Sequence, residues 1–146
     1  MERARAWLAV DPDPDTRREL EALLDRPDEL VERFDGRLEF GTAGMRGALG
    51  AGPRRMNRVL VRTVAAALAH RVRAASGPDA RIVVGYDARH RSDAFAADSA
   101  RVFAAQGMAV TVLPRPLPTP VLAFAVRHLG AAAGVMVTAS HNPAHD

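Results

Sequence analysis

The chain has 146 residues, of which 48% are hydrophobic and 25% are charged, and it contains no cysteine. This composition is typical of one globular domain, and it excludes a disulfide scaffold, a thiolate nucleophile and a cysteine-based metal site. The net charge is only +3, all 20 basic residues are arginine, and acidic residues are mixed among them, which argues against the clustered basic face of a nucleic-acid-binding protein.

The N-terminal segment is predicted to be helical. Residues 1–10 carry charged side chains and lack the apolar core of a signal peptide. After a turn at residues 11–15, Thr16 is predicted to begin a helix, because Glu19 three residues later completes a capping-box pattern. A second short helix is expected over residues 28–34. No apolar run approaches the roughly 20 residues that span a bilayer. The absence of cysteine fits a reducing compartment, and we expect a cytoplasmic protein.

Glycines are concentrated after residue 40. Residues 37–40 are predicted to form a short strand that runs into a loop over residues 41–47, and further glycines follow at Gly50 and Gly52. Such a density of glycine favours unusual backbone angles or close approach to a ligand. Asn57 is expected to cap a helix over residues 58–73, whose apolar residues recur every fourth position: Leu60, Val64, Leu68 and Val72.

The rest of the chain alternates strands with helices. Apolar, β-branched runs predict strands at residues 82–85, 108–113 and 133–138. We therefore expect a three-layer α/β/α domain with a largely parallel, or mixed, sheet, preceded by an N-terminal helical segment. The boundary is placed so that residues 1–36 form the helical extension and residues 37–146 form the α/β domain.

Two helices are expected between these strands. The first is capped by Ser92 or Asp93 and ends at Gly107, because glycine adopts the left-handed conformation that stops a helix. The second has Thr119 as its N-cap and Pro120 at the favoured first helical position.

Polar loops follow all three predicted strands. They cover residues 86–89, 115–119 and 139–143, and in an open α/β sheet ligands bind beyond the carboxyl ends of the strands. The three loops are therefore expected at one edge of the sheet. The glycine loop at residues 41–47 is a candidate to fold over that edge.

Ser140 is the best candidate nucleophile, because it stands just past a buried strand and next to His141. A single serine at such a place is more often a helix N-cap, with Pro143 starting the helix. His141, His145 and Asp146 are not taken as a metal cluster, because proximity at a chain end is weak evidence.

Two arginines are candidate phosphate ligands. Arg46 and the backbone N–H groups of the glycine loop could cradle a phosphate, and the alternative is a structural turn with a solvated arginine. The loop lacks the lysine of the common phosphate-binding loop and does not match the dinucleotide-binding pattern. Arg89 is either a phosphate ligand or an ion-pair partner of Asp87, and the sequence alone favours the ion pair.

Four motifs, in order along the chain, resemble those of the α-D-phosphohexomutases, the family of the phosphoglucomutase and phosphomannomutase type. Residues 138–143 (Thr-Ala-Ser-His-Asn-Pro) resemble the phosphoserine signature, and residues 40–47 (Phe-Gly-Thr-Ala-Gly-Met-Arg-Gly) resemble the N-terminal loop. Residues 85–89 and 117–120 match two motifs that fall between them. The helical start with Trp7 resembles the branch that contains bacterial phosphoglucomutases and phosphopentomutase-like enzymes.

The resemblance implies a mutase that interconverts hexose 1-phosphate and hexose 6-phosphate. Ser140 would carry the phosphoryl group and give it to the sugar, forming a hexose 1,6-bisphosphate. Mg²⁺ would bind the Ser140 phosphate together with aspartates of a second domain, His141 would position that phosphate, and Arg46 would face the phosphoserine or the bisphosphate. Phosphate-binding or substrate-binding roles are implied for Thr42, Gly44, Arg46, Arg89, Thr119 and Asn142.

The family pattern has four domains, and this chain covers most of the first, up to just after the phosphoserine loop. We therefore expect residues 1–146 alone to be inactive, with small sugar phosphates as partners of the complete enzyme. One alternative is a non-enzymatic binding module for sugar phosphates or phosphopeptides with the same fold. An arginine-rich nucleic-acid binder is a third, and the scattered charges and 5% aromatic content disfavour it.

Overall fold

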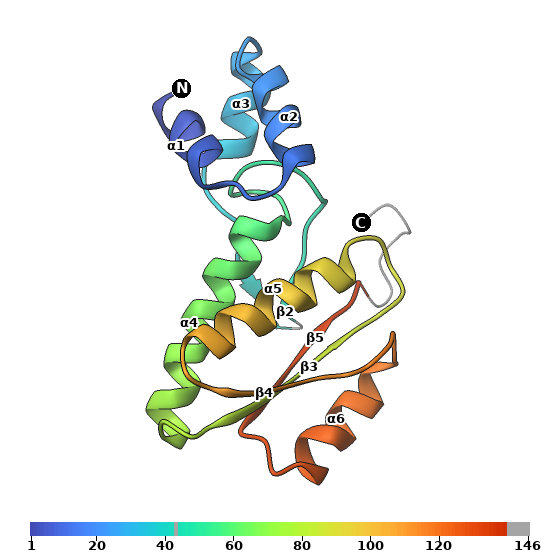
Figure 1. Ribbon diagram of the computed structural model, residues 1–146. Coiled ribbons are helices and arrows are strands. Elements are labelled where there is room, and N and C mark those ends of the chain that lie inside the picture. The colour runs from blue at the N-terminus through green and yellow to red at the C-terminus, as the bar shows by residue number, and fades with distance from the viewer. Residues whose placement is uncertain (43, 140–146) are drawn as a thin grey trace. The chain divides into compact units, whose positions relative to one another are not determined.

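The computed structural model describes residues 1–42 and 44–139, and the chain falls into two compact units (Figure 1). The first unit comprises residues 1–60, and the second comprises residues 61–139 of the described chain. Each unit has its own apolar core. None of the helices in the described ranges combines the length and the apolar character that a membrane span requires.

Three short helices form the core of the first unit. They are α1 (Glu2–Val10), α2 (Pro14–Leu23) and α3 (Pro27–Phe34), and α3 confirms the helix predicted over residues 28–34. Their apolar sides meet around Leu20, which is fully buried, and the ring of Trp7 in α1 packs edge-on against the ring of Phe34 in α3.

The start of α2 differs from the prediction, because Thr16 does not cap the helix. The N-cap is Asp13, whose side chain accepts from the Asp15 N–H, and Pro14 takes the first helical position that suits its fixed φ. Thr16 therefore lies in the first turn, and its hydroxyl donates to Asp11 Oδ2 at 2.7 Å.

Glu19, the other half of the predicted capping box, has long-range partners. Its carboxylate accepts from Arg33 Nη1 at 2.6 Å and from the Ala51 N–H at 2.9 Å. These bonds join α2 to α3 and to the glycine-rich segment, which a local sequence pattern does not reveal.

The glycine loop contains a small antiparallel hairpin of β1 (Phe40–Gly41) and β2 (Gly44–Met45). The strand predicted over residues 37–40 is therefore wrong except at its last residue. The reason is that the Leu38 N–H donates to the carbonyl of Pro53 at 2.9 Å instead of joining a sheet.

The later glycines surround Asn57, which is buried and caps the next helix as predicted. Its Oδ1 accepts from the Leu60 N–H at 2.9 Å at the start of α4 (Arg58–Ser76). Its amide nitrogen donates to the carbonyls of Gly50, Gly52 and Arg55. At Gly52 the φ of 96° is left-handed, so this part of the glycine-rich segment has a structural role.

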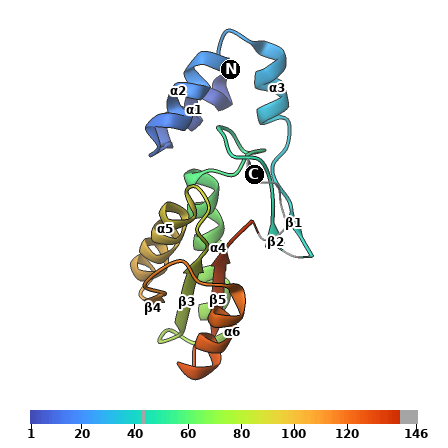
Figure 2. The same cartoon turned by 90° about the vertical axis from the view of Figure 1, so that its right-hand side faces the viewer.

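The second unit is built on a three-stranded parallel sheet. Its order is β4 (Ala109–Val112), β3 (Arg81–Tyr86) and β5 (Ala133–Val137), which confirms the predicted strands and their parallel direction (Figure 2). The central strand β3 reads as a continuous apolar run because helices cover both of its faces.

Helices form the two outer layers of this unit. Ile82 and Val84 of β3 point into a core made with α4 and α5 (Ser92–Ala105), and Val83 points into a second core made with α6 (Thr119–His128). Between α4 and α5, Arg62 contacts the fully buried carboxylate of Asp98 at 2.8 Å. The three-layer α/β/α prediction is confirmed.

Both helix starts of this unit differ from the predicted caps. The N-cap of α5 is Arg91, with a left-handed φ of 66°, and the Ser92 hydroxyl instead donates to Asp87. The N-cap of α6 is Pro118, so Thr119 is already the first helical residue. Gly107, which was predicted to stop α5, has a left-handed φ of 80° just beyond it.

The buried face of α4 also differs from the apolar positions that were predicted to form it. Of its four residues only Val72 is buried, and Ala65 and Ala69 supply the rest of the buried face. Small alanine side chains allow the helix backbone to approach the sheet closely, which an apolar count that weights leucine and valine overlooks.

Candidate functional site

The exits of the three parallel strands meet at one edge of the second unit. The Asp87 N–H, just after β3, donates to the carbonyl of Val137 at the end of β5 at 3.0 Å. The Leu117 N–H, in the loop after β4, donates to the carbonyl of Tyr86 at 3.1 Å. These bonds confirm that the loops following β3 and β4 and the end of β5 lie together.

Asp87 lies at the centre of this edge. Its Oδ1 accepts from the Ser92 hydroxyl at 2.6 Å and from the Arg89 N–H at 3.0 Å. Its Oδ2 accepts from the Ala139 N–H at 3.2 Å, and the Thr138 side chain also hydrogen-bonds to the carboxylate. One carboxylate therefore ties the exit of β3 to the start of α5 and to the exit of β5.

These contacts determine the charge of Asp87. Burial of the carboxyl raises its pKa, but hydrogen bonds from Ser92, the Arg89 N–H, Thr138 and the Ala139 N–H outweigh burial and hold the pKa below its ordinary value. Asp87 is therefore ionised at neutral pH. Because both carboxylate oxygens already accept hydrogen bonds, its chemistry is that of an anchor for N–H and O–H groups.

Arg89 forms the ion pair that the sequence favoured, but at long range. Its Nε lies 4.0 Å from Asp87 Oδ2, and 27% of its side chain is exposed. The shorter contact between the two residues is the bond from the Arg89 backbone N–H. Thr119 is exposed at the first position of α6, close in sequence to the loop that Leu117 ties to β3.

The other predicted site residues belong to the first unit or lie outside the described residues. Thr42, Gly44 and Arg46 belong to the hairpin region of the first unit, where Thr42 and Arg46 are exposed and Gly44 has a left-handed φ of 100°. Ser140, His141 and Asn142 lie outside the described residues, as do His145 and Asp146. That the glycine loop covers the sheet edge stays a prediction.

Sequence reasoning missed the bonds that Ser92 and Ala139 make to Asp87 at this edge. Ser92 was interpreted as a helix cap, although it follows Asp87 by five residues across a tight turn. The bond from Ala139 to Asp87 spans 52 residues and has no local signal. The Arg89 N–H contact two residues after an aspartate is a common local turn, and that pattern could have been found.

The described residues do not fit a magnesium site by themselves. Within residues 1–42 and 44–139, no three His, Asp or Glu side chains come together as metal ligands would. Asp87, the carboxylate at the strand exits, is already committed to N–H and O–H donors.

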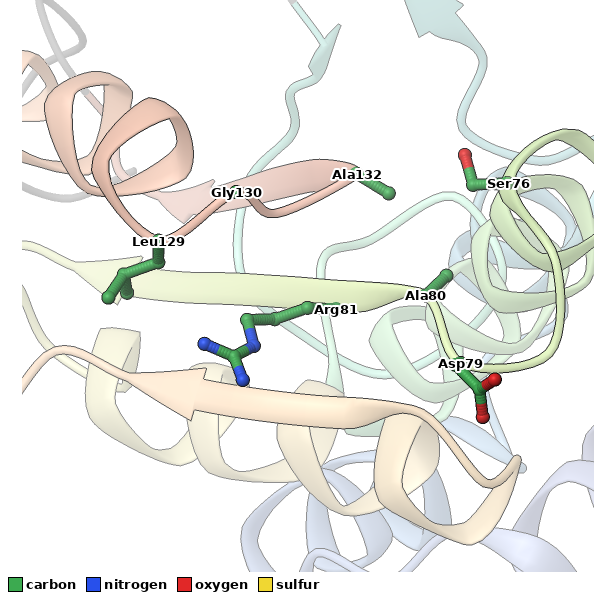
Figure 3. A pocket seen from close by; sticks show the side chains of 7 residues that line it. All are labelled: Ser76, Asp79, Ala80, Arg81, Leu129, Gly130 and Ala132. Carbon is green, nitrogen blue, oxygen red and sulfur yellow. The ribbon is translucent and has the colours of Figure 1, made fainter.

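A hollow of about 450 Å³ lies at the other end of the sheet (Figure 3). Asp79 and Arg81 line it where β3 begins, and Leu129 and Gly130 line it in the turn before β5. Ligands of open α/β sheets bind at the carboxyl ends of the strands, so this hollow is not the candidate site.

Comparison with known proteins identifies the family. Residues 37–146 match the family model described as phosphoglucomutase/phosphomannomutase, alpha/beta/alpha domain I. This chain belongs to that family. A phosphoribomutase of Saccharomyces cerevisiae is 41% identical over 145 residues, covering 96% of this chain and 23% of that protein. A phosphoglucomutase of Staphylococcus saprophyticus is 46% identical over 114 residues, covering 75% of this chain and 20% of that protein.

A solved structure of a family member supports the same assignment. It is a crystal structure of a protein assigned as a phosphomannomutase, from Thermus thermophilus, with 40% sequence identity and a TM-score of 0.67. The similarity covers 74% of this chain and 24% of that protein. Across four curated relatives, this chain spans between 19% and 24% of their length.

Proposed function

We propose that residues 37–146 act as the phosphoserine-bearing domain of a phosphosugar mutase, with Ser140 as the carrier of the transferred phosphoryl group. The observation that supports this most is the family match over residues 37–146, because it includes Ser140 together with Arg46 and Arg89. The helices of residues 1–36 would then be an extension in front of this domain.

The proposed reaction interconverts hexose 1-phosphate and hexose 6-phosphate. The bond between the Ser140 oxygen and phosphorus breaks, the phosphoryl group passes to the free hydroxyl of the sugar monophosphate, and the proton of that hydroxyl ends on the Ser140 oxygen. The resulting hexose 1,6-bisphosphate returns its other phosphoryl group to Ser140. Such transfers depend mainly on positioning and charge stabilisation.

A phosphoserine carries about −1.5 to −2 charges at neutral pH and needs cationic or N–H partners. We propose Arg46 and Arg89 as phosphate-binding cations, His141 as the group that positions the Ser140 phosphate, and Thr42, Gly44, Thr119 and Asn142 as further phosphate or substrate contacts. Any Mg²⁺ would need ligands beyond the described residues, which hold no group of three metal-binding side chains.

Because the chain spans about a fifth to a quarter of the length of its relatives, we expect residues 1–146 alone to give no turnover. The test joins residues 1–146 to the remaining domains of the Staphylococcus saprophyticus phosphoglucomutase and measures conversion of glucose 1-phosphate to glucose 6-phosphate. Ser140→Ala should abolish that conversion, at least 1000-fold below the unmutated chimera, and Ser76→Ala, an exposed serine at the end of α4, should leave it unchanged.

Phosphosite mapping gives an independent test. Intact-mass spectrometry of the protein from the cells that make it should show a phosphate on Ser140 in a chain much heavier than 15.7 kDa. A mass of 15.7 kDa with unmodified Ser140 would favour a sugar-phosphate binding module instead. Turnover by residues 1–146 alone, or a Ser140→Ala chimera with full activity, would refute the proposal.

A further inference from the structure

Three successive residues at the exit of β5 are bonded to one residue at the exit of β3. The Val137 carbonyl accepts from the Asp87 N–H at 3.0 Å, the Thr138 side chain hydrogen-bonds to the Asp87 carboxylate, and the Ala139 N–H donates to Asp87 Oδ2 at 3.2 Å. These are the last three residues before Ser140 in the sequence.

The Asp87 carboxylate is itself fixed from its other side. The hydroxyl of Ser92, which is 5% exposed, donates to Oδ1 at 2.6 Å, and the Arg89 N–H donates to the same atom at 3.0 Å. Arg91 takes a left-handed φ of 66° just before Ser92, a conformation that side-chain-bearing residues rarely adopt. A tight turn therefore brings Ser92 against Asp87, and the carboxylate cannot rotate without losing one of these partners.

We propose that Asp87 is a positioning residue for the Ser140 loop, an inference that rests on the proposed function of Ser140. Its carboxylate and backbone N–H fix residues 137–139, the described residues that immediately precede Ser140, and its proposed role is to hold that attachment point in place during phosphoryl transfer. Phosphoryl transfer requires in-line approach, and a misplacement of about 1 Å can cost about 100-fold in rate. Because several N–H and O–H donors surround the carboxylate, its own charge is partly balanced close to a phosphate-bearing loop.

The test variant is Asp87→Asn, which keeps the size of the side chain. The asparagine oxygen can still accept from Ser92 and Arg89, but its NH₂ group then faces the Ala139 N–H, donor against donor. Asp93→Asn is the matched control. It makes the same chemical change at an exposed aspartate in the first turn of α5, whose Oδ1 accepts from the Ala94 N–H.

The first measurement is amide hydrogen exchange on the 146-residue chain, with the exchange rate of each amide determined by NMR. Asp87→Asn should speed exchange at Ala139 at least tenfold, with Val83 and Val84 in the buried centre of β3 changing less than twofold. Asp93→Asn should change none of the three. Unchanged Ala139 exchange in Asp87→Asn would overturn the proposal, and so would acceleration of all three amides together, because that indicates a loss of overall stability.

The second measurement is turnover by the completed chimera, expressed per phosphorylated Ser140 as counted by mass spectrometry. Asp87→Asn should lower kcat at least tenfold and leave KM within threefold, because the change affects alignment and not sugar binding. A normal kcat would overturn the inference. A Ser140→Ala chimera that still turns over, or an unmutated chimera without turnover, counts against the proposed function instead, and the exchange measurement still decides the role of Asp87.

Discussion

Gly134, in the middle of β5, offers a direct test of how closely α6 packs on the sheet. A Cβ placed on Gly134 would lie 2.6 Å from Val126 Cγ2 of α6 and 3.5 Å from Leu122 Cγ. Carbon atoms in good contact are about 3.5–4.0 Å apart, so Gly134→Ala requires a shift of about 1 Å. Valine in a helix has one strongly preferred rotamer, so the shift falls on the backbone.

The magnitude follows from two opposing effects. Overpacking by a methyl group costs about 1–3 kcal/mol, and replacing glycine by alanine within a strand returns about 0.5–1 kcal/mol of conformational entropy. The two ranges differ by about 0–2.5 kcal/mol, and because the 2.6 Å contact is tight we expect Gly134→Ala to lower the free energy of unfolding by about 1–2 kcal/mol. Urea denaturation followed by circular dichroism measures this loss, and hydrogen exchange at β3 amides assigns it to the second unit.

A double-mutant cycle isolates the contact with Val126. Val126→Ala alone should cost about 1–2 kcal/mol through lost burial, but it removes the atom that the new methyl group meets. In the Val126→Ala background, Gly134→Ala should be neutral or slightly stabilising, which gives a coupling energy of about 1–2 kcal/mol. An equal cost of Gly134→Ala in both backgrounds would refute the packing argument.

Two further predictions concern polar side chains that hydrogen-bond to backbone groups. Asn57→Ala removes the cap of α4 and three bonds to backbone carbonyls, so it should destabilise the first unit by about 2–3 kcal/mol. Urea unfolding, monitored by the fluorescence of Trp7, the single tryptophan, measures this loss. A loss below about 0.5 kcal/mol would contradict the structural role described for Asn57. The pKa of Asp87 is lower in the folded chain than its ordinary 3.8, so its stabilising effect is present above pH 3.8 and is lost as the pH falls through the folded value. Asp87→Asn should therefore lose less stability than Asp93→Asn as the pH falls below about 4. Urea unfolding midpoints at pH 7, 5 and 3 measure this. An identical dependence of the midpoint on pH in the two variants would argue against an ionised Asp87 anchor.

The sequence predicted the layers of the second unit well, because its strands are buried on both faces. A run such as residues 82–84 needs helices above and below, and the alternation of such runs with amphipathic segments allows few arrangements other than parallel strands. Gly107 also gave a reliable helix end, since its left-handed φ of 80° suits glycine better than any other residue.

Helix starts were predicted less well, and for one shared reason. Thr16 and Ser92 have hydroxyls that can cap a helix, but each hydroxyl has a better partner in an aspartate five residues earlier. Glu19 likewise bonds to Ala51, 32 residues away, instead of completing a capping box. A local pattern shows which bonds a side chain can make, and the folded chain decides which of them it does make.

The order of the strands also has a consequence for when the strand-exit edge forms. Along the chain, β3 meets its partner β4 from residue 109 onward and its partner β5 only from residue 133 onward. Because closing the longer loop costs more entropy, we expect β5 to dock after β4. Until it docks, the Asp87 carboxylate has no Ala139 N–H to accept from. In a partly folded chain without β5 the strand-exit edge is therefore incomplete, and formation of the bond between Ala139 and Asp87 indicates that all three strands have paired.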